Sequence, residues 1–304
     1  MKSILVIRGG AIGDFVLTLP AIKLLRDNLP RARIEILGYP HIIALAESRH
    51  YADAIRSIES GALASFFAKN SELPQKWVEY FGSFDFVLSY LFDPDGIFET
   101  NVKRCGVKDF VAGPAKLGGA EHAARQLARP LEKLGLHLED PAARIYPDEK
   151  DREFGRDLLG EPRNDFIAIH PGSGSETKNW PIECWQELGE NLFAAGRKVV
   201  VVSGEADQER VRLLETAWKE KPFRRATNLT LPRLAAVLEN STFIGHDSGI
   251  SHLAAAVGAR CVLLFGPTDP AVWAPANENV RVIQAPEGNL GWLTPDNVIA
   301  AISC

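Results

Sequence analysis

The sequence has 304 residues, of which 46% are hydrophobic and 24% charged, as in an ordinary soluble globular protein. This length exceeds that of a typical domain with a single hydrophobic core, so it predicts two domains. The net charge of −5 falls in residues 151–304, because residues 1–150 are neutral, and it argues against a nucleic-acid-binding protein.

The first half of the chain alternates short apolar runs with helical patterns. Residues 4–7 form a continuous apolar run, typical of a strand buried on both faces of a parallel sheet. Residues 15–28 form a helical pattern whose apolar face carries Leu17, Ala21, Leu24 and Leu25. The expected strands are 4–7, 33–38, 54–58 and 84–89, and the expected helices are 15–28, 42–48, 62–81 and 121–134.

A polar segment with three prolines, residues 140–164, predicts a linker that contains one short helix at 150–159. The alternation then resumes. The expected strands are 166–170, 198–203, a short one that starts at 241, and 261–265. The expected helices are 181–195, 207–219, 231–239, one that begins about the turn 247–249, and one from 294. The pattern predicts two doubly wound α/β domains, 1–150 and 151–304, with ligands at strand ends in the cleft between them.

Three polar sets follow predicted strands, and the first is Gly9-Gly10-Ala11-Ile12-Gly13-Asp14. Its glycine spacing is not the Gly-x-Gly-x-x-Gly of dinucleotide-binding proteins. A carboxylate in the first helical turn would also repel a pyrophosphate. Asp14 is therefore interpreted either as a helix cap or as a general base.

The second set is the loop 170–181, His170-Pro171-Gly172-Ser173-Gly174-Ser175-Glu176-Thr177-Lys178-Asn179-Trp180-Pro181. Its glycines and serines can approach phosphate oxygens, and Lys178 supplies a positive charge. It is not a Walker loop, because no Ser or Thr follows the lysine. The alternative is a flexible surface loop with a solvated lysine.

The third set, 247–252, joins a short strand to a helix of small residues. Asp247 or Ser248 can cap this helix, Gly249 allows close approach to its backbone, and Gly258 can end it in the left-handed conformation. Free amide groups and the helix dipole make its start an anion site, for which the alternative is an ordinary capped turn.

Two histidines flank this turn. His252, one turn into the helix, could donate to a departing phosphate or could simply be packed in the core. His246 either neighbours the site at the strand end or is an inert exposed residue.

Together the three sets resemble glycosyltransferase family 9, the lipopolysaccharide heptosyltransferases. The motifs run across almost the whole chain in the expected order. They are Gly13-Asp14-Phe15-Val16-Leu17-Thr18-Leu19-Pro20-Ala21, His170-Pro171-Gly172 with Lys178-Asn179-Trp180-Pro181, Asp247-Ser248-Gly249-Ile250-Ser251-His252-Leu253-Ala254-Ala255-Ala256, and Phe265-Gly266-Pro267-Thr268-Asp269-Pro270 with Trp273 and Pro275.

The resemblance implies a GT-B fold, in which two Rossmann-like domains face a cleft. The N-terminal domain (1–150) would bind the acceptor and the C-terminal domain (151–304) the nucleotide-sugar donor. The implied reaction is transfer of a heptose from ADP-heptose to the lipopolysaccharide core, with inversion at the anomeric carbon. His246 departs from the family pattern, which has Asn or Val before the aspartate.

The resemblance also assigns residues. Asp14 matches the catalytic aspartate. A carboxylate after the strand 199–203 binds the donor in the family, and Asp207 matches it better than Glu205. The expected donor and diphosphate residues are Ser173, Lys178, Asp207, Asp247, Ser248, Gly249 and His252.

Inverting transfer needs a base for the acceptor hydroxyl and stabilisation of the departing diphosphate, which Asp14 and the helix start with Lys178 can supply without a cofactor or metal. The Asp-x-Asp spacing of metal-dependent transferases occurs only at Asp93-Pro94-Asp95, in the other domain. Acidic groups of the acceptor could meet cations of the first half, each of which is otherwise a solvated surface charge. These are Arg8 and Arg56, followed by Lys103, Arg104 and Lys108.

Two other functions stay open, a GT-B nucleotide-sugar epimerase and a degenerate nucleotide-binding module. Cys105, Cys184, Cys261 and Cys304 have no metal or redox spacing, and no apolar run is long enough to span a membrane. The protein is expected in the cytoplasm, with peripheral contact to the inner membrane allowed. Whether a C-terminal helix crosses back onto the first domain stays open.

Overall fold

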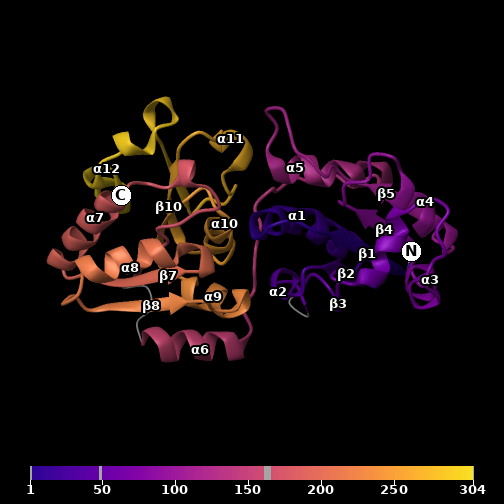
Figure 1. Cartoon of the computed structure of the whole chain (residues 1–304), viewed down its shortest axis with the longest axis horizontal. Coiled ribbons are helices and arrows are strands. Elements are labelled where there is room, and N and C mark those ends of the chain that lie inside the picture. Colours follow the sequence, from indigo (N-terminus) through magenta and orange to yellow (C-terminus); the bar gives the residue numbers. More distant parts are fainter. Residues whose placement is uncertain (1, 48–49, 161–165, 304) are drawn as a thin grey trace. The chain divides into compact units, whose positions relative to one another are not determined.

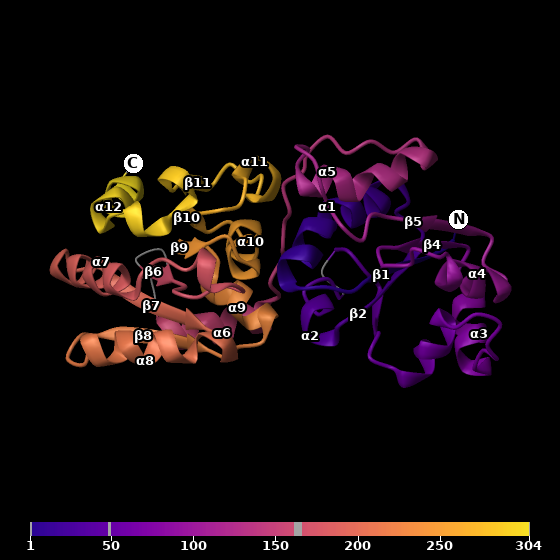
Figure 2. The same ribbon diagram turned by 45° about the horizontal axis from the view of Figure 1, so that its top comes forward.

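The computed structural model describes residues 2–47, 50–160 and 166–303. The chain divides into two units, Met1–Pro141 and Ala142–Cys304. Each unit contains one parallel sheet with helices packed on both faces (Figures 1 and 2). The expected doubly wound α/β class is therefore confirmed.

The sheet of the first unit has the order β3-β2-β1-β4-β5, and every neighbouring pair is parallel. Its strands are β1 (Ser3–Arg8), β2 (Arg33–Gly38), β3 (Ala54–Ser57), β4 (Phe86–Ser89) and β5 (Asp109–Ala112). Its helices are α1 (Ile12–Asn28), α2 (Pro40–Ile43), α3 (Gln75–Gly82), α4 (Ile97–Arg104) and α5 (Ala123–Ala128), with 3-10 helices at Gly61–Phe67 and Arg129–Leu134.

The sheet of the second unit has the order β11-β10-β9-β6-β7-β8, again with parallel neighbours. Its strands are β6 (Phe166–Ile169), β7 (Lys198–Ser203), β8 (Phe223–Thr227), β9 (Thr242–His246), β10 (Arg260–Phe265) and β11 (Val280–Gln284). Its helices are α6 (Glu149–Leu159), α7 (Ile182–Ala194), α8 (Gln208–Ala217), α9 (Leu231–Leu238), α10 (Gly249–Ala256), α11 (Pro270–Trp273) and α12 (Pro295–Ser303).

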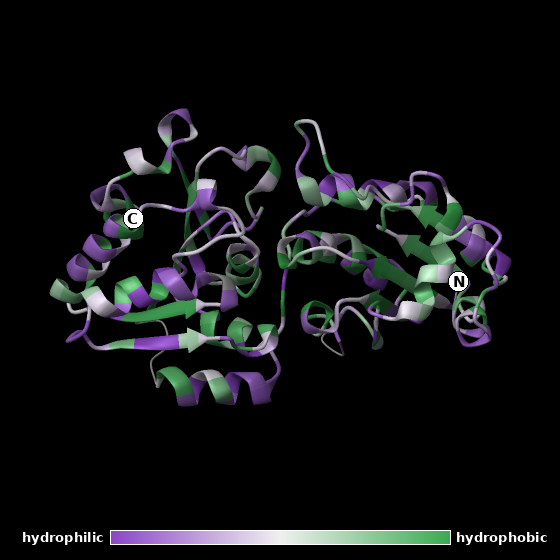
Figure 3. Cartoon of the chain, viewed as in Figure 1, coloured by the Kyte–Doolittle hydropathy of each residue, from purple (hydrophilic) through white to green (hydrophobic). Residues whose placement is uncertain are grey.

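Apolar side chains from the strands form the cores. In the first unit, Leu5, Ile7 and Val87 pack against Phe81 of α3 and Phe98 of α4. In the second unit, strand residues pack against a tryptophan-rich layer on one sheet face that includes Trp180, Trp185 and Trp218. The central strands are accordingly hydrophobic along their length, while hydrophobic and hydrophilic residues alternate along the helices (Figure 3).

The strand orders define one reversal point in each sheet. In the first unit the chain builds β1, β2 and β3 outward and then returns to the other side of β1 with β4. In the second unit it builds β6, β7 and β8 and returns to the other side of β6 with β9. Loops that leave such a pair of strands diverge, so the carboxyl ends of β1 and β4, and of β6 and β9, are the expected ligand sites.

Several expected helices differ in extent. The expected helix 62–81 is two elements, a 3-10 helix that ends at Phe67 and α3 from Gln75, because Pro74 cannot continue a helix. Residues 129–134 are likewise a 3-10 helix after α5, with Pro130 near its start. The expected helix 42–48 is shorter and earlier, Pro40–Ile43, and Ser48 lies outside the described residues.

The sequence reading missed β5, β8, β11 and the helix α4. All three missed strands lie at sheet edges. Edge strands pair on one side only and keep polar side chains, as Arg224 and Arg225 in β8 show, so they lack the continuous apolar run that marks a central strand.

The segment expected to be a linker belongs largely to the second unit, which begins at Ala142. Its helix α6 is joined to the end of α9 by Arg152, whose guanidinium donates to both carboxylate oxygens of Glu239 at 2.9–3.2 Å. The part at 161–165 lies outside the described residues.

Candidate active site

Asp14 lies in the first turn of α1, directly after β1. The helix begins at Ile12 with Ala11 as its N-cap, and Asp14 Oδ2 accepts a hydrogen bond from the Ala11 N–H at 2.9 Å. Gly10 makes this fold possible: its φ is +98°, and a Cβ there would lie 2.6 Å from Asp14 Oδ2. Asp14 is therefore not the N-cap itself, but its carboxylate bonds back to the N-cap amide from the first turn and remains 40% exposed.

Arg8, the last residue of β1, holds the other oxygen of Asp14. Its guanidinium lies 3.3 Å from Asp14 Oδ1 and also donates to the Asp14 main-chain oxygen. The side chain is only 5% exposed and lies over the Tyr90 ring, 5.5 Å from its centroid. Burial lowers the pKa of Arg8, although Asp14 and Tyr90 oppose this effect. Arg8 therefore orients Asp14 and is not the solvated surface charge expected as the alternative to an acceptor contact, and that acceptor contact stays a prediction.

The reversal point of the second unit carries an ion pair. Lys178 Nζ, in the loop after β6, lies 2.6 Å from Asp247 Oδ2, directly after β9. Thr268, in the loop after β10, donates to the same carboxylate oxygen at 2.8 Å. The side chain of Asp247 is 10% exposed and that of Lys178 30%. Three strand-end loops thus converge on one carboxylate, and the lysine remains accessible.

Ser248 is the N-cap of α10. Its hydroxyl accepts a hydrogen bond from the Ser251 N–H at 3.3 Å, which leaves Asp247 to the ion pair with Lys178. Gly249 is the first residue of the helix, and Gly258 follows its end with φ +86°, as expected. The free amide groups of this helix start lie next to the residue that holds Lys178, so two features that favour anions are adjacent.

His246 is fully buried, so its interpretation as an exposed residue is wrong. Its Nε2 accepts a hydrogen bond from the Trp180 N–H at 2.9 Å, and its Nδ1 lies 3.3 Å from the Gly172 carbonyl oxygen. Burial lowers the pKa of His246 to about 3. The ring is therefore neutral and bridges two parts of the loop 170–181.

Asp207 follows β7 and faces the same loop. Its carboxylate lies 3.0 Å from His170 Nε2 and accepts the Gly204 N–H at 3.0 Å, and it is buried. Burial raises its pKa, but hydrogen bonding to His170 and Gly204 prevails and the pKa is lowered. A Cβ at Gly172 would lie 1.7 Å from Asp207 Oδ1, so the loop backbone packs directly on the carboxylate. The donor contact of Asp207 stays a prediction, and Glu205 is the exposed carboxylate of this turn.

The remaining donor residues have different surroundings. Ser173 is partly exposed and donates to the Ser175 carbonyl at 2.8 Å, within the loop. His252 is 5% exposed, which fits the packed interpretation, and its phosphate contact stays a prediction.

The structure identifies Arg210 as a residue that sequence reasoning missed. From α8, its guanidinium donates to the carbonyl oxygens of Pro171, at 2.7 Å, and Trp180. Because both partners are main-chain atoms, no side-chain pattern in the sequence pointed to it.

Cations of the first unit have partners of their own. Arg56 stacks on the Tyr80 ring at 4.2 Å, pairs with Glu35 at 3.2 Å and is 42% exposed. Lys103 pairs with Glu99 at 2.6 Å. Asp93, of the Asp-x-Asp spacing, accepts the N–H groups of Phe98 and Glu99 at the start of α4. The contacts of Arg56 and Lys103 with an acceptor stay predictions.

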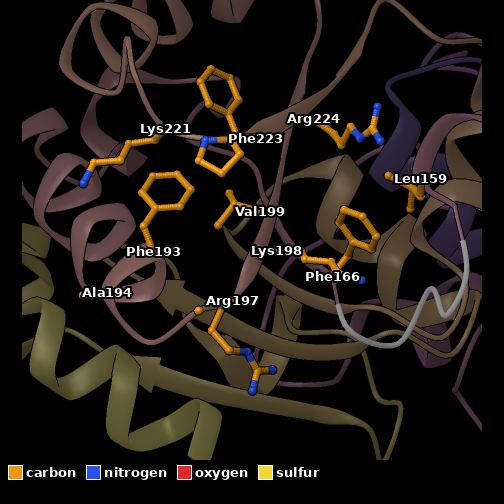
Figure 4. Close-up of a pocket in the computed structure, with 12 residues that line it drawn as sticks. Leu159, Phe166, Phe193, Ala194, Arg197, Lys198, Val199, Lys221, Phe223 and Arg224 are labelled. Carbon is orange, nitrogen blue, oxygen red and sulfur yellow. The ribbon is translucent and has the colours of Figure 1, made fainter.

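A separate pocket of 660 Å³ lies at the amino-terminal ends of strands in the second sheet, opposite the strand ends that carry Lys178 and Asp247 (Figure 4). Phe166, Lys198 and Phe223, which line it, are the first residues of β6, β7 and β8. These are the amino-terminal ends of the strands, away from the convergent loops at the carboxyl ends. Across the described residues, no three His, Cys, Asp or Glu side chains gather as metal ligands would, and no helix is long and apolar enough to cross a membrane.

These features define the class of protein. Both units are Rossmann-like, and each reversal point carries an ion pair, Arg8 with Asp14 in the first unit and Lys178 with Asp247 in the second. Solved structures share this architecture: a glycosyl transferase of family 9 from Veillonella parvula DSM 2008 superposes with a TM-score of 0.81 at 20% identity, covering 99% of this chain and 96% of that one. The E. coli heptosyltransferase WaaC with ADP has a TM-score of 0.78 at 17% identity, covering 99% of both chains. The expected GT-B class is confirmed.

The family follows from the sequence itself. The sequence model of glycosyltransferase family 9 (heptosyltransferase) matches residues 120–293, which is more than half of the chain, so the chain belongs to this family. Among curated relatives, "Lipopolysaccharide heptosyltransferase 3" of E. coli K12 is 26% identical over 292 residues, which cover 88% of this chain and 83% of the relative. The protein is therefore a glycosyltransferase, and the expected enzyme class is confirmed.

Proposed function

We propose that the protein transfers a heptose from ADP-heptose to the lipopolysaccharide inner core or a similar glycan, with inversion at the anomeric carbon. The observation that carries this proposal is the Lys178–Asp247 pair beside the start of α10, at the reversal point of the second sheet. The relative named as a lipopolysaccharide heptosyltransferase and the WaaC structure with ADP support the choice of substrates.

In this proposal the second unit binds the donor. Lys178 pairs with the diphosphate, and the amide groups at Ser248 and Gly249 add hydrogen bonds and the favourable end of the helix dipole. Asp247 orients the Lys178 side chain before the donor binds, and Thr268 in turn holds the Asp247 carboxylate. Ser173 and His252 complete the phosphate contacts, and the carboxylate after β7, Asp207 or Glu205, supports the rest of the nucleotide.

The first unit binds the acceptor and supplies the base. Asp14 takes the proton of the acceptor hydroxyl as its oxygen forms a bond to the anomeric carbon. The bond between that carbon and the diphosphate oxygen breaks, and ADP leaves with both electrons of the bond. Lys178 and the helix start stabilise the negative charge on the leaving group. Arg8 keeps the Asp14 carboxylate in position, and Arg56 offers a half-exposed cation to acidic acceptor groups.

The donor assignment is tested by the thermal stability of the protein with ADP-, UDP- and GDP-sugars. A ligand at a hundredfold excess over its dissociation constant stabilises the protein by about 2.7 kcal/mol, so only ADP-sugars should raise the melting temperature clearly. Selective stabilisation by UDP- or GDP-sugars would contradict the ADP assignment.

The reaction is tested with ADP-heptose and lipopolysaccharide lacking the outer heptoses. The expected product is a new glycosidic bond of inverted configuration, established by the one-bond carbon–hydrogen coupling of the anomeric carbon. Release of a free epimerised sugar, or retention of configuration, would contradict the proposed reaction.

We also propose a cytoplasmic location with peripheral contact to the inner membrane. Cys105, Cys184 and Cys261 are free thiols, as is usual in a reducing compartment, and a lipopolysaccharide acceptor is presented at a membrane surface. Fractionation of cells should recover the protein in the soluble and salt-extractable membrane fractions. Recovery only after detergent treatment would contradict peripheral contact.

A further inference from the structure

Both ring nitrogens of His246 form hydrogen bonds with the main chain of the loop 170–181. A main-chain N–H can only donate and a carbonyl can only accept, so Nε2 accepts from Trp180 and the protonated Nδ1 donates to the Gly172 oxygen. Gly172 and Trp180 lie near the two ends of the loop 170–181. A single neutral ring at the end of β9 therefore ties together both ends of the loop after β6.

The ring itself is held firmly by aromatic neighbours. The Trp185 ring meets it edge-on, with centroids 5.4 Å apart, and Trp180 packs edge-on against Trp185 at 5.2 Å. The indole N–H of Trp180 donates to the Leu293 carbonyl at 2.9 Å. Because these three rings are fully buried, the position of the imidazole is determined by core packing.

Other contacts act on the same two ends of the loop. Arg210 donates to the carbonyls of Pro171 and Trp180, and His170 pairs with the buried Asp207. The middle of the loop, which contains Ser173 and Lys178, is exposed or half-buried. The loop thus has two anchored ends and an accessible centre.

Lys178 depends on these anchors because of where its partner lies. Its ammonium group meets Asp247, which is the residue directly after His246. The imidazole therefore fixes the loop that carries the lysine to the same strand end that carries the carboxylate. An apolar residue at position 246 would leave the Trp180 N–H and the Gly172 carbonyl buried without these partners, and the loop would have to move to satisfy them.

We propose that His246 is a positioning residue that sets Lys178 for the diphosphate of the donor. This inference rests on the proposed function, in which Lys178 binds the diphosphate. His246 does not touch the ligand. It acts by fixing both ends of the loop 170–181 to the end of β9, so that Lys178 lies beside Asp247.

The test is a double-mutant cycle on the binding of ADP, measured by calorimetry with the full-length protein. Lys178→Ala removes a charge-assisted contact and should raise the dissociation constant for ADP roughly 10- to 100-fold. His246→Ala should raise it by roughly 10-fold or more. Because His246 acts through Lys178, the double variant should bind ADP no more weakly than Lys178→Ala alone.

Two further variants separate positioning from general damage. His246→Gln can still donate and accept, so it should keep ADP affinity within about threefold of the wild type. Val262→Ala truncates an equally buried side chain on the neighbouring strand β10, so it should lower the melting temperature without changing ADP affinity. If His246→Ala does not fold, His246→Asn, which is too short to reach both partners, takes its place in the cycle.

Each outcome has one meaning. An unchanged ADP affinity in His246→Ala, or additive losses in the double variant, would overturn the positioning role while Lys178→Ala still defines the donor site. An unchanged ADP affinity in Lys178→Ala would instead overturn the proposed donor site, and the inference with it.

Discussion

The strand ends that carry Asp14 and Lys178 differ in how they are held. Asp14 is 40% exposed and depends on one buried arginine and one main-chain amide. Lys178 pairs with an aspartate that is 10% exposed and also bound by Thr268. Its loop is further tied down by His246, Arg210 and the His170–Asp207 pair.

The difference matches the work that each site does in the proposed reaction. A general base must stay accessible to the hydroxyl that it deprotonates, so it cannot be enclosed by its own unit. A leaving-group site is most effective when its charges and dipoles are oriented beforehand, because reorganisation during the reaction costs free energy. In the proposed reaction the first unit therefore offers an open carboxylate, and the second offers an anion site whose lysine and loop are held by several contacts.

The largest expected effect comes from removing the open carboxylate. Asp14→Asn should lower the transfer rate roughly 100- to 10,000-fold, because the amide cannot accept the acceptor proton. The dissociation constant for ADP should not change. Rates come from a discontinuous transfer assay. The matched control is Asp27→Asn on the same helix α1, where the carboxylate pairs with Lys23 and the rate should stay near wild type. A slow Asp27 variant would contradict the comparison.

Gly10 tests how easily the open site is disturbed. Gly10→Ala places a Cβ 2.6 Å from Asp14 Oδ2 and strains a backbone with φ +98°, so the carboxylate must move and the transfer rate should fall roughly tenfold or more. Gly106→Ala is the control, because its φ is +96° but no atom lies within 4 Å of the new Cβ. Both variants place an L side chain at a positive φ, so both should lose stability in thermal unfolding. Equal transfer rates in the two would refute the role of Gly10.

The buried histidine gives the second unit a pH-dependent stability. The folded pKa of His246 is about 3, whereas an unfolded histidine titrates near 6.5. Between these values the unfolded chain binds the extra proton, so the free energy of unfolding falls as the pH falls. The pKa difference corresponds to roughly 2 kcal/mol between pH 7 and pH 5.

Burial is the main cause of that low pKa. Of the groups facing the ring, Gly172 and Asp207 raise the pKa, and His170 and Arg210 lower it. The pKa of Asp207 is lowered from that of an ordinary aspartate, so its effect on stability falls at a more acidic pH than this window. His246→Gln should remove the dependence. The difference in unfolding free energy between the two proteins, followed by tryptophan fluorescence in urea, should therefore change by roughly 2 kcal/mol from pH 7 to pH 5. Parallel curves would contradict the assignment.

The smallest expected effect is at the start of α10. Ser248→Ala removes a capping hydrogen bond and should lower the unfolding free energy by about 1 kcal/mol. Thr230→Ala at the start of α9 is the matched control, because the Thr230 side chain makes no capping bond there. Its unfolding midpoint should be close to wild type. If both variants lost the same stability, the cap at Ser248 would not be the cause.

The sequence by itself determined the parallel α/β architecture and the motifs of the family. Central strands such as β1 and β7 are buried on both faces, and their continuous apolar runs report this directly. Asp14, Lys178 and Asp247 could be singled out because each follows such a run. The start and end of α10 were also readable, since Ser248 and Gly258 act locally.

Only the tertiary structure decided how those residues are held. The edge strands β5, β8 and β11 form because a neighbouring strand supplies their hydrogen bonds, and no local pattern reveals that partner. The same is true of His246 and Arg210, whose partners are main-chain atoms of a loop distant in sequence. Apart from the missing N–H of proline, main-chain groups are the same in every residue, so a sequence records the side chain of such a contact but not where it binds.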